Sequence, residues 1–328
     1  MRAITATLFL IAVLMVTSST VLGWALKRYL LKELAQDSSE LLPKIRSVKV
    51  HWFPMRVTIE GLTFASGDRN STLVELYVPE VSTRIERKSK SQIFPVELTF
   101  LDIVVEKLQV IVTEGDKKSS RDYGPEPGSG LRAIASHLQK ISINEAKFTY
   151  LRIYGGRSAT IRLKEIQGSL VVADNEIVSN LKGRLEHSGY FTLALKVPRS
   201  LSNTDMDLKL EISKQDLADF KPYFRPAEGV ILSGNLKSGS STVSVRGPIV
   251  RTRVNASYEG LKVEFEKNYQ RSEFSTFILN LGKSLSLRTQ SLERPARTRS
   301  VQLYRNSDES ILHFIFRSMG KAALDVAS

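Results

Sequence analysis

The stretch SVKVHWFPMRVTIEGLTFAS, residues 47–66, alternates apolar and polar side chains and is interrupted once. Its apolar members are spaced two apart within each half: Val48, Val50 and Trp52, then Val57 and Ile59. Pro54 separates the halves, and a proline without an N–H group belongs at an edge or a bend of a sheet. A period of two predicts β-strands with one apolar face, so the fold depends on what this face contacts.

The same alternation returns along almost the whole chain. DMDLKLEIS, residues 205–213, places Met206, Leu208, Leu210 and Ile212 on one face and charged side chains on the other. Connections such as ADNE, EHSG and YEGL are typical of hairpins. We expect strands at 47–53, 56–64, 73–85, 96–105, 107–113, 141–151, 158–164, 166–173, 176–186, 189–197, 204–213, 229–237, 241–246, 249–258, 260–266, 272–281, 284–289, 299–305 and 310–317.

These strands predict a mainly β fold, with antiparallel sheet that is apolar on one face and polar on the other. Two arrangements satisfy the pattern. Two sheets could pack their apolar faces together as a sandwich, or one curled sheet could form an open groove lined by its apolar face. Alternation alone does not separate these arrangements.

Helical patterns are few. GLRAIASHLQK, residues 130–140, and KQDLADFKPYF, residues 214–224, predict two short helices. EGDKKSSRDYGPEPGSG, residues 114–130, has the composition of an exposed linker or loop. We therefore expect a first β module at 47–113, a linker at 114–130 and a second β-rich module at 131–328.

The N-terminus carries an uncharged run from Ala3 to Leu26, which is long enough to cross a bilayer as a helix. Trp24 is placed as an interfacial aromatic, and Lys27 and Arg28 follow on the water side. A cleaved signal peptide is the alternative, but the run exceeds an ordinary signal core and lacks an Ala-x-Ala site. We expect an uncleaved transmembrane anchor with its flank at 1–28 and an amphipathic connector helix at 29–46.

The charge composition limits the chemical classes of partner that we expect the protein to bind. The 328 residues include 47 Lys and Arg against 34 Asp and Glu, a net charge of +13, which favours anionic partners. The densest basic cluster, RIERKSK at 84–90, has no aromatic residue and no nucleic-acid-binding motif around it. Anionic phospholipid head groups and acidic polymers remain candidate partners, and we expect no nucleic acid.

Motifs for catalysis, a metal or a cofactor are missing from the sequence. The chain has no cysteine, and its four histidines, at positions 51, 137, 187 and 313, lie far apart. It contains neither the His-Glu-x-x-His nor the Gly-x-Ser-x-Gly pattern. The sequence therefore predicts a protein that is not an enzyme, with no catalytic, metal-binding or cofactor-binding residues.

The N-terminal run followed by SVKVHWFPMRVTIEGLTF resembles the start of the AsmA-like family of bacterial envelope proteins, in its branch of uncharacterised domains related to the groove proteins AsmA and TamB. LVELYVPEVSTRIE and FLDIVVEKLQVIVTEGD are similar to the next strand pair of the family. DLADFKPYFRPAEGVILSGNL and SVQLYRNSDESILHFIFRSMGK resemble later segments. The likeness touches most of the chain, although the family members that form grooves are usually longer.

The resemblance implies a single-pass protein of the Gram-negative inner membrane whose body lies in the periplasm. It implies lipid handling during outer-membrane biogenesis or maintenance, through an apolar groove lined by Val48, Val50, Trp52, Val57, Ile59, Ile103 and Val105. The flanking charges favour the opposite topology, with the body in the cytoplasm, because the positive charges Lys27, Arg28 and Lys32 after the run outnumber the positive charges before it. The alternative function is an assembly factor whose β-domains bind another envelope protein.

Overall fold

A computed structural model describes residues 19–28, 30–31, 43–67, 72–88, 97–115, 140–154, 156–173, 176–198, 205–266, 297–305 and 311–327. The strands are β1 (Ser47–Trp52), β2 (Met55–Gly67), β3 (Thr72–Lys88), β4 (Glu97–Glu106), β5 (Gln109–Glu114), β6 (Lys140–Tyr154), β7 (Arg157–Val172), β8 (Glu176–Leu185), β9 (Gly189–Pro198), β10 (Met206–Asp216), β11 (Val230–Arg246), β12 (Ile249–Phe265) and β13 (Arg297–Tyr304). The helices are η1 (Leu217–Phe220), α3 (Lys221–Glu228) and α5 (Ile311–Ala327), and residues 19–28 are also helical.

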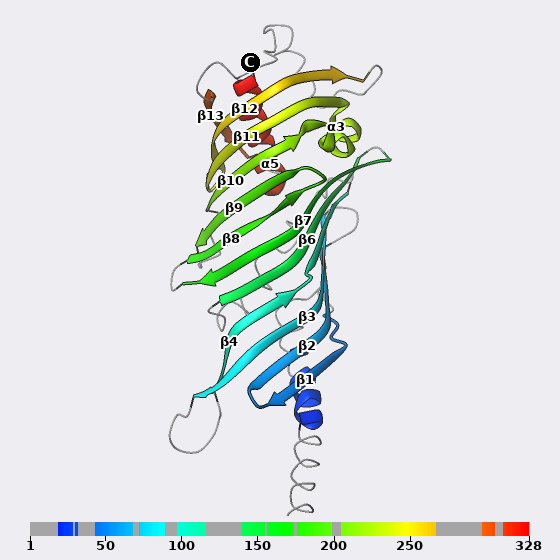
Figure 1. Ribbon diagram of the computed structural model, residues 1–328, viewed down its shortest axis with the longest axis vertical. Coiled ribbons are helices and arrows are strands. Elements are labelled where there is room, and N and C mark those ends of the chain that lie inside the picture. The colour runs from blue at the N-terminus through cyan, green and yellow to red at the C-terminus, as the bar shows by residue number, and fades with distance from the viewer. Residues whose placement is uncertain are drawn as a thin grey trace, which may run out of the picture.

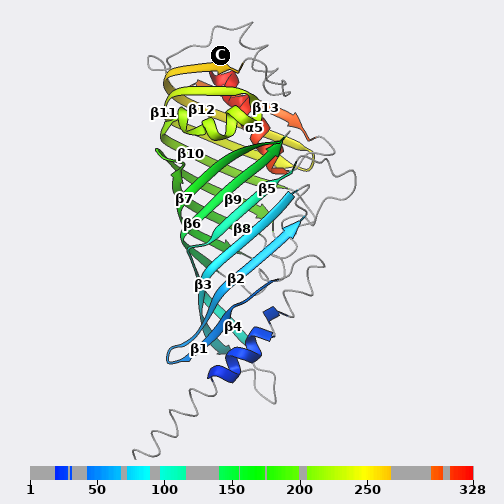
Figure 2. The same ribbon diagram turned by 90° about the vertical axis from the view of Figure 1, so that its right-hand side faces the viewer.

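The described strands form one 13-stranded sheet in the order β1-β2-β3-β4-β6-β7-β8-β9-β10-β11-β12-β13, with β5 between β3 and β6. The strands are stacked along the long axis of the molecule nearly in chain order, and the sheet curls (Figures 1 and 2). The mainly β, antiparallel prediction is confirmed. Because the described strands share one sheet, they do not form the two facing sheets of a sandwich.

Pairing is antiparallel everywhere in the described sheet except where β6 runs parallel to β4 and β5. Parallel neighbours need a long crossover connection, and the chain between β5 and β6 contains the predicted linker at 114–130. The expected boundary between the two β modules therefore falls at this parallel join, while the sheet continues across it. The division into modules stays a prediction.

A line of left-handed backbone positions crosses the sheet. One such position lies in or beside most of the longer strands: Gly61, Lys107, Glu145, Glu165, Glu186, Lys214, Gly234 and Gly260. Their neighbours pair across the strands, as Gly234 and Gly260 show: a Cβ on Gly234 would lie 2.5 Å from the Gly260 carbonyl oxygen. We call this line the crease.

The crease switches which side chains face inward. Within one strand the buried residues on its two sides are an odd number apart, as in Val78 and Thr83 of β3, Ala159 and Ile166 of β7, Val230 and Val243 of β11, and Tyr258 and Leu261 of β12. A left-handed residue rotates the strand in the manner of a β-bulge, which bends it and strengthens its twist. The crease thus accounts for the curl of a single long sheet.

Three sequence predictions are corrected, two by the crease at Glu165 and Gly260 and the third by a register shift between Leu236 and Ser238. The runs 158–164 and 166–173 are one strand, β7; 229–237 and 241–246 are β11; 249–258 and 260–266 are β12. In each case the break in alternation marks a local rotation of a continuous strand and not a connection between two strands.

The helices pack on the apolar side of the sheet. The short helix expected within residues 214–224 is confirmed, as η1 and the start of α3. The strand expected at 310–317 is wrong, because these residues belong mainly to α5. Among the α5 side chains whose burial the structure describes, the buried ones follow helical spacing: Phe314, Ile315, Ser318, Ala322 and Val326. Two further expected strands, at 272–281 and 284–289, and most of the helix expected at 130–140 lie outside the described residues.

The expected anchor, residues 3–26, falls mainly outside the described residues, as does most of the connector at 29–46. Residues 19–28 form a helix next to β1 (Figure 2). None of the helices in the described ranges combines the length and the apolar content needed to cross a bilayer.

Candidate functional site

The strand registers connect apolar side chains into two rows that cross the whole sheet on its inner face. Directly paired residues point to the same face, so each chain of pairs marks one row. The first apolar row is Val48, Ile59, Val81, Val105, Ile143, Gly168, Leu181, Leu193, Leu210, Ser241, Val254 and Arg299. The second apolar row is Val50, Val57, Thr83, Ile103, Ile141, Leu170, Ser179, Leu195, Leu208, Val243, Thr252 and Val301, with a register shift between Thr83 and Ile103.

The residues between these rows point outward and form a polar row. Its members are Lys49, Thr58, Ser82, Val104, Ser142, Ser169, Asn180, Ala194, Lys209, Thr242, Arg253 and Ser300. Neither apolar row contains a charged residue before Arg299 on the last strand. This part of the sheet is therefore amphipathic across all of its strands, and not only in the runs where the sequence alternates most clearly.

Six of the seven residues proposed from sequence lie in these rows. Val48, Ile59 and Val105 belong to the first apolar row, and Val50, Val57 and Ile103 to the second. Trp52 pairs with Met55 at the end of the β1–β2 hairpin. The sequence thus identified members from β1, β2 and β4, and the register extends the same surface to β13.

Sequence reasoning missed the row members from β6 to β11, although several lie in runs with clear alternation. Leu193, Leu195, Leu208 and Leu210 are examples, from GYFTLALKV and DMDLKLEIS. The missing information was the register, which decides which alternating runs meet on one surface.

The N-terminal end of the rows is covered by the helix at residues 19–28. Leu26 packs against the cluster of Val50 and Val57, which are 6% and 1% exposed. A Cβ on Gly23 would lie 2.3 Å from the carbonyl oxygen of Val48, so only glycine allows this approach. The Lys27 Nζ donates to the Arg46 carbonyl oxygen at 2.9 Å.

The C-terminal end of the rows is covered by α5, which lies against β11, β12 and β13 (Figure 2). Phe314 and Ile315 pack with Val243, Val245 and Val250, and all five are at most 5% exposed. One polar contact lies inside this interface: the hydroxyls of Thr252 and Ser318 are 2.7 Å apart. The Ser318 hydroxyl also lies 2.8 Å from the Ile315 carbonyl oxygen and donates to it.

The middle of the second apolar row is different. Ile103, Ile141, Leu170 and Leu195 are half-buried and belong to none of the buried clusters that the described residues form. From β4 to β9 the sheet order contains four inter-strand steps, or about 19 Å at about 4.8 Å per step. We call this stretch of both rows, on β4 and β6–β9, the mid-sheet floor.

Beyond the crease, α3 covers another part of the inner face. Tyr223 of α3 packs with Val112, Tyr150 and Ala159. Tyr150 is 1% exposed and donates its hydroxyl to the Glu114 carboxylate. Burial, with a smaller contribution from the Glu114 charge, raises the pKa of Tyr150 far above its usual value. This tyrosine is thus held neutral as part of the packing.

A buried polar cluster joins the β8–β9 turn to η1. The Gln215 side chain is fully buried and its Nε2 donates to the Asp219 carboxylate at 2.9 Å, while the Ser188 hydroxyl donates to the same oxygen at 2.5 Å. Asp216 caps η1 by accepting from the Ala218 N–H at 2.9 Å. These contacts fix two chain segments against each other and leave no nucleophile and base in an open pocket.

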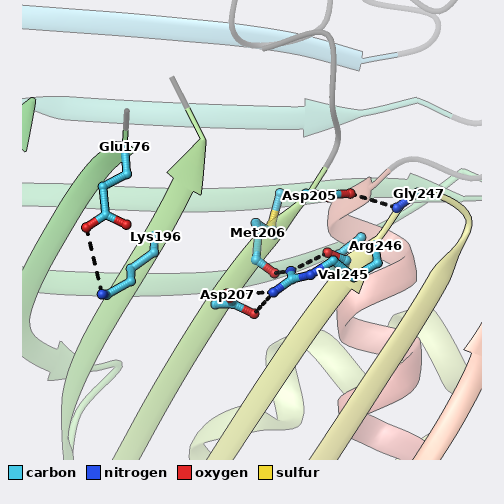
Figure 3. A network of polar contacts seen from close by, with 8 residues as sticks. All are labelled: Glu176, Lys196, Asp205, Met206, Asp207, Val245, Arg246 and Gly247. Atoms are coloured by element: carbon cyan, nitrogen blue, oxygen red, sulfur yellow. Dashed lines mark hydrogen bonds and ion pairs between the residues drawn. The ribbon is translucent and has the colours of Figure 1, made fainter. Parts of the chain in front are cut away.

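The outer face carries ion pairs, and Figure 3 shows one group near the ends of β10 and β11. Arg246 Nη2 donates to both carboxylate oxygens of Asp207, at 2.9 and 2.8 Å, and Asp205 accepts from the Gly247 N–H at 2.9 Å. The hydrogen bond from Arg246 is the main reason that the pKa of Asp207 is lowered. Both side chains are about half exposed, so this pair is a surface feature.

Within the described ranges, no group of three or more His, Asp or Glu side chains is arranged to hold a metal ion. The chain matches no family model, and a comparison with curated proteins gives no match. The likeness to the AsmA-like family therefore stays a prediction from the sequence, and the apolar inner face is the candidate site.

Proposed function

We propose that the protein binds the acyl chains of lipids along the mid-sheet floor and acts without catalysis. The single observation that carries this proposal is the pair of apolar rows from β1 to β12, in which Ile103, Ile141, Leu170 and Leu195 of the second row are only half-buried and lie outside the described clusters. An acyl chain has no hydrogen-bonding or charged groups that need a partner. The side chains of the nine first-row residues from Val48 to Leu210 are likewise without polar or charged atoms. Contiguous apolar area of this kind marks a binding surface.

The wider setting belongs to the same proposal. The uncharged N-terminal run anchors the protein in the inner membrane of a Gram-negative envelope, and the body lies in the periplasm. An AsmA-like protein of this kind would serve outer-membrane biogenesis or maintenance by handling phospholipid. The net charge of +13 suits the anionic head groups that remain outside an apolar groove.

The test uses two neighbouring valines of β4 that face opposite sides. Val105 pairs with Val81 and Ile143 in the first apolar row, whereas Val104 pairs with Ser82 and Ser142 in the polar row. Both side chains are half-buried. We expect wild type to co-purify with lipid, Val105→Asp to lose it, and Val104→Asp to retain it.

Mass spectrometry of lipid extracts and thermal melts measure binding and folding separately. Val105→Trp is a second variant that fills the floor without adding charge, and it should also lose lipid while remaining folded. A wild-type protein that carries no lipid in mild detergent contradicts the proposal. So does loss of folding in both Val105 variants, since it would mean that this position is sealed core.

A second function, assembly with another envelope protein, is favoured by the edge of the sheet. Among the described strands β13 pairs only with β12, and a partner strand would add at its other side. In that case substitutions with proline on β13 would abolish the association, while Val105→Asp would leave it intact. Pull-down of the full chain with each variant distinguishes the two functions.

A further inference from the structure

The end of the sheet next to the N-terminal helix has an unusual surface. The helix at residues 19–28 is fixed to β1 through Gly23, Leu26 and Lys27, as described above. The β1–β2 hairpin ends beside this helix at the same end of the molecule in both views (Figures 1 and 2). The helix and the hairpin are therefore joined by direct contacts at this end of the sheet.

Large apolar side chains are exposed on both parts of this end. Phe53, in the hairpin turn, is 84% exposed, the highest value among the described large apolar residues. On the helix, Val21 and Trp24 are 65% and 56% exposed. One exposed aromatic is ordinary on a protein surface, but a group at one end of a molecule indicates an interaction site.

Basic residues surround this apolar group. From residue 19 to residue 60 the sequence has seven Lys or Arg against four Asp or Glu, which gives a local charge of +3. Five of the basic residues that the structure describes, Arg28, Lys44, Arg46, Lys49 and Arg56, are exposed, and the Arg28 guanidinium lies 4.1 Å from the Trp24 ring centroid. Exposed aromatics within a basic rim are suited to the interface of an anionic bilayer.

We propose that the β1–β2 hairpin tip is a second membrane contact, in which Phe53 inserts among lipid head groups beside the N-terminal helix. The proposal rests on the proposed function, because it places the first strands of the apolar rows at the membrane surface. Val50 and Val57 lie on β1 and β2 behind this tip and are covered by the N-terminal helix, so the contact would bring the covered start of the rows next to the bilayer. The committed partner is a lipid surface and not a protein.

The experiment exploits the absence of cysteine, which makes any introduced cysteine a unique labelling site. His51→Cys is exposed and two residues from the tip, so it reports on the hairpin while Phe53 remains. The full chain, labelled there with an environment-sensitive fluorophore, is reconstituted in vesicles of phosphatidylcholine mixed with phosphatidylglycerol. Quenching by nitroxide lipid is compared with quenching by iodide in water.

We expect the label at position 51 to be quenched several-fold more by nitroxide lipid than a label at Tyr304→Cys, which is 63% exposed at the opposite end. Adding Phe53→Asp to the His51→Cys protein should remove most of this quenching and restore iodide access. Thermal melts should show that Phe53→Asp remains folded, because the side chain has almost no internal contacts to lose.

Equal iodide access at positions 51 and 304 overturns the inference, as does quenching at position 51 that is insensitive to Phe53→Asp. Either result leaves the proposed function standing if wild type still carries lipid. Conversely, a protected label on a protein without bound lipid refutes the lipid-binding floor and supports the membrane contact.

Discussion

The C-terminal end of the apolar rows and the mid-sheet floor have the same alternation but different surroundings. At the C-terminal end, α5 seals Val243, Val245 and Val250, which are at most 2% exposed. On the floor, the corresponding residues Leu170 and Leu195 are half-buried and lie outside every described cluster. The comparison teaches that an apolar sheet face becomes core or binding surface according to what covers it, and not according to its own sequence.

Truncation of a buried residue should have the largest effect and should be specific to the sealed end. Phe314 of α5 is fully buried, so Phe314→Ala should lower the free energy of unfolding by about 4 kcal/mol. Leu195→Ala on the floor should cost about 1 kcal/mol, because the side chain is only half removed from water. Urea unfolding of both variants measures the difference, and equal losses would show that the floor is also sealed.

Gly168 tests how closely the strands of the floor approach each other. A Cβ at this position would lie 2.0 Å from the Asn180 carbonyl oxygen of β8, so Gly168→Ala should cost about 3 kcal/mol. Gly239→Ala is the control, because its nearest neighbour is the flexible Leu236 side chain at 3.3 Å. In thermal melts the melting temperature of Gly168→Ala should be well below that of Gly239→Ala. Similar melts would mean that β7 and β8 separate easily.

The smallest effect should come from the outer face above the sealed end. The pKa of Asp207 is lowered by Arg246, so the pair contributes stability above the ordinary aspartate pKa of about 3.9. That contribution should be lost as pH falls through the lower pKa of the folded state. Both groups are half exposed, so Asp207→Asn should cost less than about 1 kcal/mol at neutral pH and nothing in strong acid. Unfolding curves at pH 6 and pH 2 check this, and a cost that persists in acid would contradict it.

The strands were predictable because each buries one face, but their continuity was not. At Glu165 and Gly260 the alternation changes sides, and a sequence reading ends the strand there. The backbone instead passes through a left-handed residue and keeps its ladder, as the pairing on both sides of Glu165 shows. A break in period alone does not distinguish a hairpin from a bulge, because both place glycine or charged residues at the break.

The end of the chain was misread for a different reason. ILHFIF is rich in apolar and aromatic residues and fits a strand over six positions, whereas its helical period emerges only when Ser318, Ala322 and Val326 are included. Two small residues and a valine are weak signals by hydrophobicity. They are buried because α5 approaches β12 closely, which no local pattern reveals.

The near-sequential order of the sheet also has a consequence for how the chain folds. Most strands pair with the strand made just before them, so native contacts can form by stepwise addition at a growing edge. Two steps are different, because 25 residues separate β5 from β6 and 31 separate β12 from β13, so a longer connection must close before these strands can pair. Because strand pairing links only neighbouring strands, with α3 as a helix that also contacts both β7 and β11, local damage away from α3 should fray one part of the sheet while distant strand pairs stay folded.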